Sequence, residues 1–195
     1  MAKIGVLALQ GDVSEHVLAL ERAGEGKIQA ILVRKSGQME ECDALVLPGG
    51  ESTTICRQLE SSGLTDELKA ASLSGKPILA TCAGLVLVSK EIMGNRESLV
   101  KPLGLMNIKI SRNAFGPQKE SFEADLQVKG LDRPYRAVFI RAPAIGEVGR
   151  GVEVLASIGD TVVAARQGNL LALAFHPELT QDPRIHQIFL KMLEA

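Results

Sequence analysis

One segment of this sequence places a thiol between small residues. Cys82 lies in the Ala-Thr-Cys-Ala-Gly run of residues 80–84, which follows a short apolar stretch and precedes residues of helical composition. Such a strand-to-helix turn has the layout of a nucleophile elbow, and the amino end of the following helix favours the thiolate. The alternative is a small buried hydrophobe, which is the role we assign to Cys42 and Cys56 because neither has a glycine-bounded turn.

A histidine and a carboxylate emerge together near the other end of the chain. His176 and Glu178 follow the apolar run of residues 170–175, which predicts a strand. Residues two apart in an extended segment point to the same side, so Glu178 can hold one ring nitrogen while the other exchanges a proton with the thiol. The alternative is a loop in which His176 only packs or caps, but its occurrence together with the cysteine turn favours catalysis. We expect His16 and His186, which lie in helical patterns, to be core or solvated histidines.

Two glycines directly follow another predicted strand. Gly49 and Gly50 stand in the Leu-Pro-Gly-Gly-Glu-Ser-Thr run of residues 47–53. Backbone N–H groups beside glycines can approach a substrate closely and form an oxyanion hole. A glycine turn without a ligand and a phosphate cradle are the alternatives. The Walker lysine is missing from the run, which argues against nucleotide binding.

Composition narrows the classes of function. The 195 residues suit a single domain spanning residues 1–195, and the 22 basic and 23 acidic side chains leave a net charge of -1, which provides no field for nucleic acid. We expect no membrane partner, because no apolar run is long enough to cross a bilayer and the amino terminus shows no leader. Three cysteines are an odd number that suits reduced thiols and a cytoplasmic location.

Strand-length and helix-length segments alternate through the first half, which predicts a mostly parallel sheet covered by helices on both faces. Asp12 and Glu15 predict a capping box for a first helix, and Asp182 is the predicted cap of a last helix over residues 183–193. Residues 146–151 are predicted to be a loop. Predicted strands cover residues 3–9, 28–33, 44–47, 77–81, 106–111, 122–128, 137–140, 152–158, 161–166 and 170–175, and predicted helices cover residues 12–23, 54–60, 64–71 and 82–91.

Taken in order, the glycine run, the cysteine turn and the His-Pro-Glu segment resemble the class I glutamine amidotransferases. That resemblance implies a three-layer α/β/α sandwich with a mixed, mostly parallel sheet, of flavodoxin-like type. It also implies a catalytic triad of Cys82, His176 and Glu178, which forms a glutamyl thioester and releases ammonia. Ala80 departs from the family pattern, which usually has glycine before the threonine, and we expect it to shift the turn slightly.

Other segments are similar to the glutaminase subunits of pyridoxal 5'-phosphate synthases. They are the opening run of residues 5–11 and the segments 112–116, 139–143 and 164–168. The resemblance implies that L-glutamine contacts Gly49, Gly50, Glu51, Arg112, Ile140 and Arg141. It further implies that Gln10, Gly49 and Ala83 belong to the oxyanion region, with Gln10 coupling activity to docking of the partner.

The expected function is therefore hydrolysis of L-glutamine to L-glutamate and ammonia for pyridoxal 5'-phosphate (vitamin B6) biosynthesis. The resemblance implies a partner synthase subunit of the PdxS type within a large hetero-oligomer, and neither a cofactor nor a metal in this chain. The alternatives are a catalytically silent docking subunit, a glutaminase subunit of another synthase, and a cysteine hydrolase or chaperone of the related DJ-1-like fold. The last alternative leaves His176 and Glu178 without a purpose.

Overall fold

The computed structural model describes residues 1–94, 99–112, 115 and 121–194. Its strands are β1 Ala2–Leu7, β2 Ile28–Val33, β3 Ala44–Leu47, β4 Ile78–Thr81, β5 Glu91–Ile92, β6 Ile108–Ser111, β7 Ser121–Leu126, β8 Tyr135–Ile140, β9 Ala144–Val148, β10 Glu153–Ile158, β11 Thr161–Gln167 and β12 Leu170–Leu173. Its helices are α1 Val13–Gly24, α2 Ser52–Ser61, α3 Leu64–Leu73, α4 Ala83–Val88 and α5 Arg184–Lys191, with short 3-10 helices η1 Pro177–Leu179 and η2 Met192–Glu194.

The strands form one large mixed sheet and a separate two-stranded hairpin. The large sheet has the order β2-β1-β3-β4-β12-β11-β9-β6-β5, with β10 paired to β11 at its side. The five strands from β2 to β12 run parallel, whereas β11, β9 and β6 join through antiparallel pairs. β7 and β8 make the hairpin. The expected mostly parallel, mixed sheet is confirmed.

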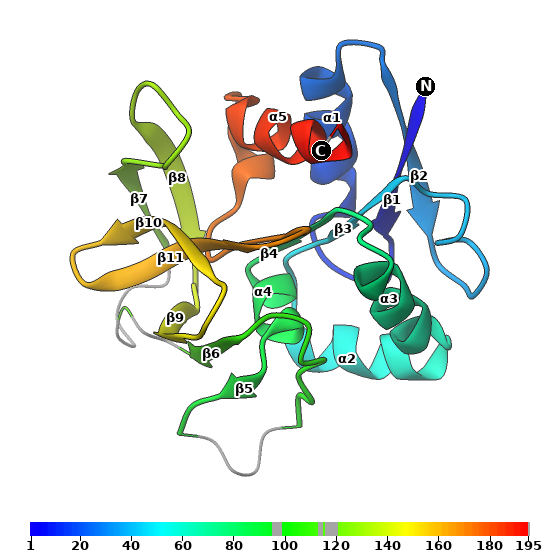
Figure 1. The fold of residues 1–195 in the computed structure, drawn as a ribbon, viewed down its shortest axis with the longest axis horizontal. Helices are drawn as coiled ribbons and strands as arrows, with labels where there is room; N and C mark the ends of the chain where they lie inside the picture. Colours follow the sequence, from blue (N-terminus) through cyan, green and yellow to red (C-terminus); the bar gives the residue numbers. More distant parts are fainter. Residues whose placement is uncertain (95–98, 113–114, 116–120, 195) are drawn as a thin grey trace.

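Helices cover the parallel half of this sheet on both faces. Figure 1 shows α1 and α5 lying together above the strands, with α2, α3 and α4 below them. β3, β4 and β12 carry only buried side chains, as expected for strands enclosed by helices on both sides. The molecule is therefore a three-layer α/β/α sandwich, the architecture that the sequence predicted.

The three central strands β3, β4 and β12 are parallel, and their carboxyl ends lie at the same end of the sheet. Thr81 of β4 lies opposite Leu173 of β12, and Leu47 of β3 lies opposite Ala80 of β4. The glycine run, the cysteine turn and the His-Pro-Glu segment each leave one of these strands at that end. The register of these strands therefore brings the three segments together. In open α/β sheets, ligands bind outside the carboxyl ends of the strands, which is where these segments lie.

The predicted capping box of the first helix is wrong. Asp12 does precede α1, but its side chain makes no capping hydrogen bond, and the Glu15 carboxylate accepts a hydrogen bond from Ser14. The Asp12 carboxylate turns instead toward His176. Asp182 does cap α5, because its Oδ1 accepts a hydrogen bond of 3.1 Å from the Arg184 N–H.

Several other boundaries differ from the predicted ranges, and two of these differences have a clear local cause. α4 ends at Val88, three residues early, because Ser89 turns extended and donates its hydroxyl to the Val86 carbonyl at 2.8 Å. The predicted loop over residues 146–151 is wrong in its first half, because β9 continues to Val148 while paired with β6.

Of the segment 112–116, residues 113, 114 and 116 lie outside the described residues. Among the described helices, none has the length and apolar character needed to cross a bilayer.

Candidate active site

Cys82 lies on a strained turn between β4 and α4. Its backbone adopts φ 46° and ψ -101°, a conformation that costs a non-glycine residue on the order of 1–3 kcal/mol. The Cys82 N–H donates to the Leu173 carbonyl at 2.8 Å, which ties the turn to β12. A Cβ on Gly84 would stand 2.2 Å from the Leu47 carbonyl oxygen, so this glycine lets the first turn of α4 lie against β3. These contacts hold the strained turn in place, and the thiol therefore lies at the carboxyl end of β4, as in a nucleophile elbow.

Ala80 lies within β4 rather than in the turn. Its side chain is fully buried and it pairs with Ala172 of β12 and Leu47 of β3. Ala80 therefore belongs to the regular part of the strand, and its expected slight effect on the turn stays a prediction. Cys42 and Cys56 are also buried and free, as expected of structural cysteines.

His176 and Glu178 form a buried hydrogen-bonded pair beside the cysteine turn. The His176 Nδ1 lies 2.7 Å from Oε1 of Glu178. The extended geometry expected for this segment is wrong: Pro177 begins the 3-10 helix η1, and that tight turn folds the Glu178 carboxylate back onto the ring. The His176 Nε2 is buried and makes no hydrogen bond among the described residues, so it is the nitrogen left to exchange a proton with the thiol.

Asp12 is a second carboxylate on the same ring nitrogen, whereas the sequence pattern predicted a different role for it. Its Oδ2 lies 3.3 Å from Nδ1 of His176, and its side chain is about one third exposed in the cavity. The hydrogen bond to His176 lowers the pKa of Asp12 below its usual value. Asp12, His176 and Glu178 could also be considered as metal ligands, since their ligand atoms lie within 4.8 Å of one another. The 2.7 Å separation within the His176–Glu178 pair is, however, a direct hydrogen bond with no cation between the two atoms.

Burial and hydrogen bonding set the charges of the pair. Burial lowers the pKa of His176, but the neighbouring side chains of Asp12, Cys82 and Glu178 outweigh this effect and raise that pKa well above its usual value. Burial raises the pKa of Glu178, which the hydrogen bond and the charge of His176 oppose. An imidazolium held between a thiolate and a carboxylate is the state in which cysteine is most nucleophilic. The arrangement therefore suits acyl transfer through Cys82.

The glycine run packs directly against the base. A Cβ on Gly49 would stand 2.6 Å from Cε1 of His176, and a Cβ on Gly50 would stand 2.6 Å from Oε1 of Gln10. Gln10 accepts a hydrogen bond of 2.7 Å from the Glu51 N–H. Only glycine fits at positions 49 and 50 without moving these side chains.

The Glu51 carboxylate is engaged by the helix that follows it. Its oxygens accept from the N–H groups of Thr53 at 3.0 Å and Thr54 at 2.7 Å, which caps α2. The hydrogen bond from the Thr53 N–H is the largest cause that lowers the pKa of Glu51 to about 2. The carboxylate is therefore charged and fixed at the rim of the site.

A cavity of about 420 Å³ opens over these groups. It is of the size that small-molecule ligands require. Of the predicted site residues, the structure places Gln10, Gly50, Glu51, Cys82, Ala83, Arg112, Ile140, Arg141 and His176 on its wall. Gly49 and Glu178 lie behind that wall, against the ring of His176.

Two arginines give the cavity its positive charge. Arg112 follows β6 and its Nη2 lies 3.5 Å from Oγ of Ser52. Arg141 follows β8 and adopts φ 42°, a strained value for a non-glycine residue. Within the described part of the chain neither arginine forms an ion pair, so both guanidinium groups are open to an anionic ligand.

Comparison with known proteins gives this site a family. A family model described as the SNO glutamine amidotransferase family matches residues 6–195, which is nearly the whole chain. The chain belongs to the SNO glutamine amidotransferase family.

Individual relatives are similar in sequence to this chain over almost their full lengths. A pyridoxal 5'-phosphate synthase subunit PdxT of Methanothrix thermoacetophila is 59% identical, over 98% of this chain and 100% of its own. The PdxT of Methanosarcina barkeri is 53% identical, over 96% of each chain. A crystal structure described as a glutamine amidotransferase matches with a TM-score of 0.90 at 48% identity, covering 98% of this chain and 99% of that one. A putative GMP synthase subunit from Thermoplasma acidophilum shares the fold, with a TM-score of 0.71 at 18% identity, covering 100% and 94% of the two chains.

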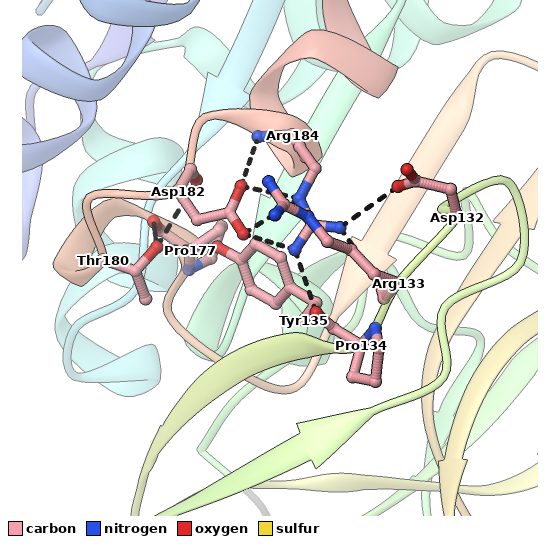
Figure 2. A network of polar contacts seen from close by, with 8 residues as sticks. All are labelled: Asp132, Arg133, Pro134, Tyr135, Pro177, Thr180, Asp182 and Arg184. Carbon is pink, nitrogen blue, oxygen red and sulfur yellow. Dashed lines mark hydrogen bonds and ion pairs between the residues drawn. The ribbon is translucent and has the colours of Figure 1, made fainter.

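A polar network holds η1 of this SNO glutamine amidotransferase in place. Figure 2 shows Arg184 at its centre, with its guanidinium bonded to Asp182 at 2.6 Å and to the Pro134 carbonyl at 2.9 Å. The Tyr135 hydroxyl lies 2.8 Å from Oγ1 of Thr180, which donates in turn to the Pro177 carbonyl at 3.1 Å. The segment that carries Glu178 is therefore fastened to both β8 and α5.

Proposed function

We propose that this chain hydrolyses L-glutamine to L-glutamate and ammonia as the glutaminase subunit of a pyridoxal 5'-phosphate synthase. Its family membership supports the amidotransferase chemistry, and the names of its relatives support the assignment to this synthase. The observation that carries the proposal is that Cys82 and His176 line the same cavity, with Glu178 hydrogen-bonded to His176 behind its wall. We also propose that residues 1–195 act as one domain, in keeping with their continuous hydrophobic core.

The reaction begins with attack of the Cys82 thiolate on the carboxamide carbon of glutamine. The His176 imidazolium gives its Nε2 proton to the departing amine, so that ammonia leaves and a glutamyl thioester remains. His176 then takes a proton from water, whose oxygen attacks the thioester and displaces the Cys82 sulfur. L-glutamate leaves and the thiolate–imidazolium pair is restored. Glu178 holds the ring in the orientation that both proton transfers need, with Asp12 as a second acceptor at Nδ1.

The remaining site residues suit binding and stabilisation of charge. Arg112 and Arg141 are the groups we assign to the α-carboxylate of glutamine, because a planar guanidinium binds both oxygens of a carboxylate. Backbone groups of Gly50, Glu51 and Ile140 line the rest of the substrate path in this proposal, and Gly49 lies behind them against the ring of His176.

We assign the oxyanion region to the backbone at Gly49 and Ala83, together with Gln10. Ala83 opens α4 directly after the nucleophile, and loss of one oxyanion donor typically slows acyl transfer about 10²- to 10³-fold. The side chain of Gln10 holds the Glu51 N–H and touches Gly50. Movement of Gln10 on docking of the partner would therefore change the glycine run, which is how we propose that docking and activity are coupled.

The partner in this proposal is a synthase subunit of the PdxS type, arranged with several glutaminase chains in a large hetero-oligomer. Ammonia released into water would be protonated and lose its nucleophilicity, so direct transfer through an enclosed path is required for efficient use. We place the complex in the cytoplasm, in keeping with three free cysteines.

Glutamate release from L-glutamine, measured with and without a pyridoxal 5'-phosphate synthase subunit, tests this function. We expect the partner to stimulate release, and Cys82→Ala to lose about 10⁶-fold, as when the nucleophile of a catalytic triad is removed. Equal binding of Cys82→Ala and of the unchanged chain to the synthase is the control for folding. Release that is indifferent to the synthase would assign the chain to another partner, and no release from the unchanged chain in either condition would leave a silent docking subunit.

A further inference from the structure

Two histidines lie behind the triad, and the proposed reaction does not use them. His16 of α1 and His186 of α5 are fully buried, so of the two expected alternatives, core or solvated, both are core histidines. The Nδ1 of His16 lies 3.5 Å from Nε2 of His186, and the two rings meet edge to face. Burial of a polar ring costs free energy unless its nitrogens have hydrogen-bond partners. The partners of the two rings therefore indicate their tautomers and their role.

The other nitrogen of His16 faces the catalytic machinery. Its Nε2 lies 3.1 Å from Oγ1 of Thr81, the residue before the nucleophile, and 3.3 Å from Oε2 of Glu178. Oε1 of Glu178 already binds His176, whereas Oε2 is buried and makes no well-aligned hydrogen bond among the described residues. His16 is therefore the polar neighbour of Oε2, the Glu178 oxygen that His176 does not bind.

These contacts decide which nitrogen of His16 carries the proton. A lone pair on Nε2 would face the negative charge of Glu178, whereas an Nε2–H lies between two oxygens that both attract it. Nδ1 then accepts from the Nε2–H of His186, which leaves the His186 Nδ1 as a bare lone pair. That atom is buried and has no hydrogen-bond partner among the described residues, and a bare acceptor costs less there than an unpaired N–H.

The surroundings keep both rings neutral. Burial, followed by the charges of His186 and His176, lowers the pKa of His16 well below its usual value. Burial, followed by the charge of Arg22, lowers the pKa of His186 to about 4. Among the described residues, the titratable and charged groups found to act on the pair are Arg22 on α1, His176 just before η1 and Glu178 within it.

We propose that His16 is a positioning residue for the reaction. Its neutral Nε2–H is shared between Thr81 and Glu178, so it fastens the strand end that carries the nucleophile to the carboxylate that orients the base. His186 holds His16 in the required tautomer from behind. The proposal rests on the proposed glutaminase function for its kinetic consequence, whereas the tautomer itself does not depend on turnover.

Kinetics of the chain bound to its synthase test the positioning role. We expect His16→Leu to lower kcat about 10- to 100-fold with little change in KM, because Glu178 loses its polar neighbour at 3.3 Å from Oε2 and holds His176 less firmly. The acid limb of the pH–rate profile should move to higher pH, since the Glu178 carboxylate becomes easier to protonate. His16→Gln carries an amide N–H and should recover most of the rate. Leu20→Ala, a cavity in the same buried face of α1, is the control that loses stability without moving the pH profile.

Nitrogen-15 NMR of the full, unchanged chain tests the tautomer directly. The sequence has three histidines, so their ring signals can be assigned from one variant each. We expect His16 to be a neutral Nε2–H ring from pH 5 to pH 8. An Nδ1–H ring, a charged ring at neutral pH, or a His16→Leu variant with unchanged rate and pH profile would overturn the proposal. Absence of glutaminase activity in the unchanged chain would count against the proposed function alone, because the NMR result stands without it.

Discussion

Substitution of Gly49 by alanine tests whether the glycine run sets the position of the base. The added Cβ would stand 2.6 Å from Cε1 of His176, about 0.8 Å short of the 3.4 Å at which ordinary van der Waals contact begins. The ring is buried and its Nδ1 is held by Glu178 and Asp12, so it has to yield by most of that distance. A misplacement of about 1 Å at a reacting group can cost about 10²-fold in rate, which corresponds to about 2.7 kcal/mol of transition-state stabilisation.

The assay is glutamate release by the Gly49→Ala chain in complex with its synthase, with kcat and KM determined separately. Gly146→Ala is the matched control, because the one close contact of its Cβ would be with the sulfur near the flexible end of Met93, at 2.5 Å, and its other neighbours would lie at 3.5 Å or more. We expect a fall of about 10²-fold in kcat for Gly49→Ala and no comparable fall for the control. Full activity in Gly49→Ala would refute the reasoning, since it would show that the ring does not need the space that glycine leaves.

Two other predictions concern stability and its dependence on pH. Glu51→Ala should lower the free energy of unfolding by roughly 1 kcal/mol at neutral pH, because it removes the cap of α2. The pKa of Glu51 in the folded chain is about 2, below its ordinary 4.5, so this contribution to stability is present above pH 4.5 and is lost as the pH falls toward 2. Urea unfolding of the unchanged and Glu51→Ala chains should show a smaller difference in stability at pH 3 than at pH 7. An equal difference at both pH values would contradict this prediction. Burial raises the pKa of Tyr135 to about 12, so the stability it contributes is complete below pH 10 and is lost as the pH rises toward 12. Tyr135 is the single tyrosine in a sequence without tryptophan, so phenolate absorbance reports it alone, and titration near pH 10 in the folded chain would refute its burial.

Local signals in the sequence were enough to predict the main parts of the site. Glycines after a strand, a thiol between small residues and a histidine two residues before a carboxylate each depend on the chemistry of a few adjacent positions. The alternation of strands and helices then places all three segments at the carboxyl edge of a parallel sheet. The residues around Cys82, Gly49 and His176 could therefore be predicted without knowing any long-range contact.

Other features depended on contacts that local pattern does not contain. An aspartate three residues before a glutamate signals a helix cap, and only the approach of His176, 164 residues further along the chain, draws Asp12 into the site instead. The helical pattern left open whether His16 would be a core or a solvated residue, and it gave no indication that Glu178 and His186 would be its neighbours. β9 was missed because Gly146 and Glu147 weaken its strand character, and pairing with β6 outweighs that weakness.

The position of β12 has a consequence for synthesis of the protein. Leu170–Leu173 is inserted between β4 and β11 in the middle of the sheet, and His176 follows it directly. A growing chain exposes Cys82 about ninety residues before it exposes the base, and until then β4 has an open edge and the Cys82 N–H has no Leu173 carbonyl to bind. A nascent chain thus holds an unactivated thiol. In the proposed mechanism, glutamine could be consumed only after translation has delivered β12 and His176, so the topology would withhold activity from unfinished copies.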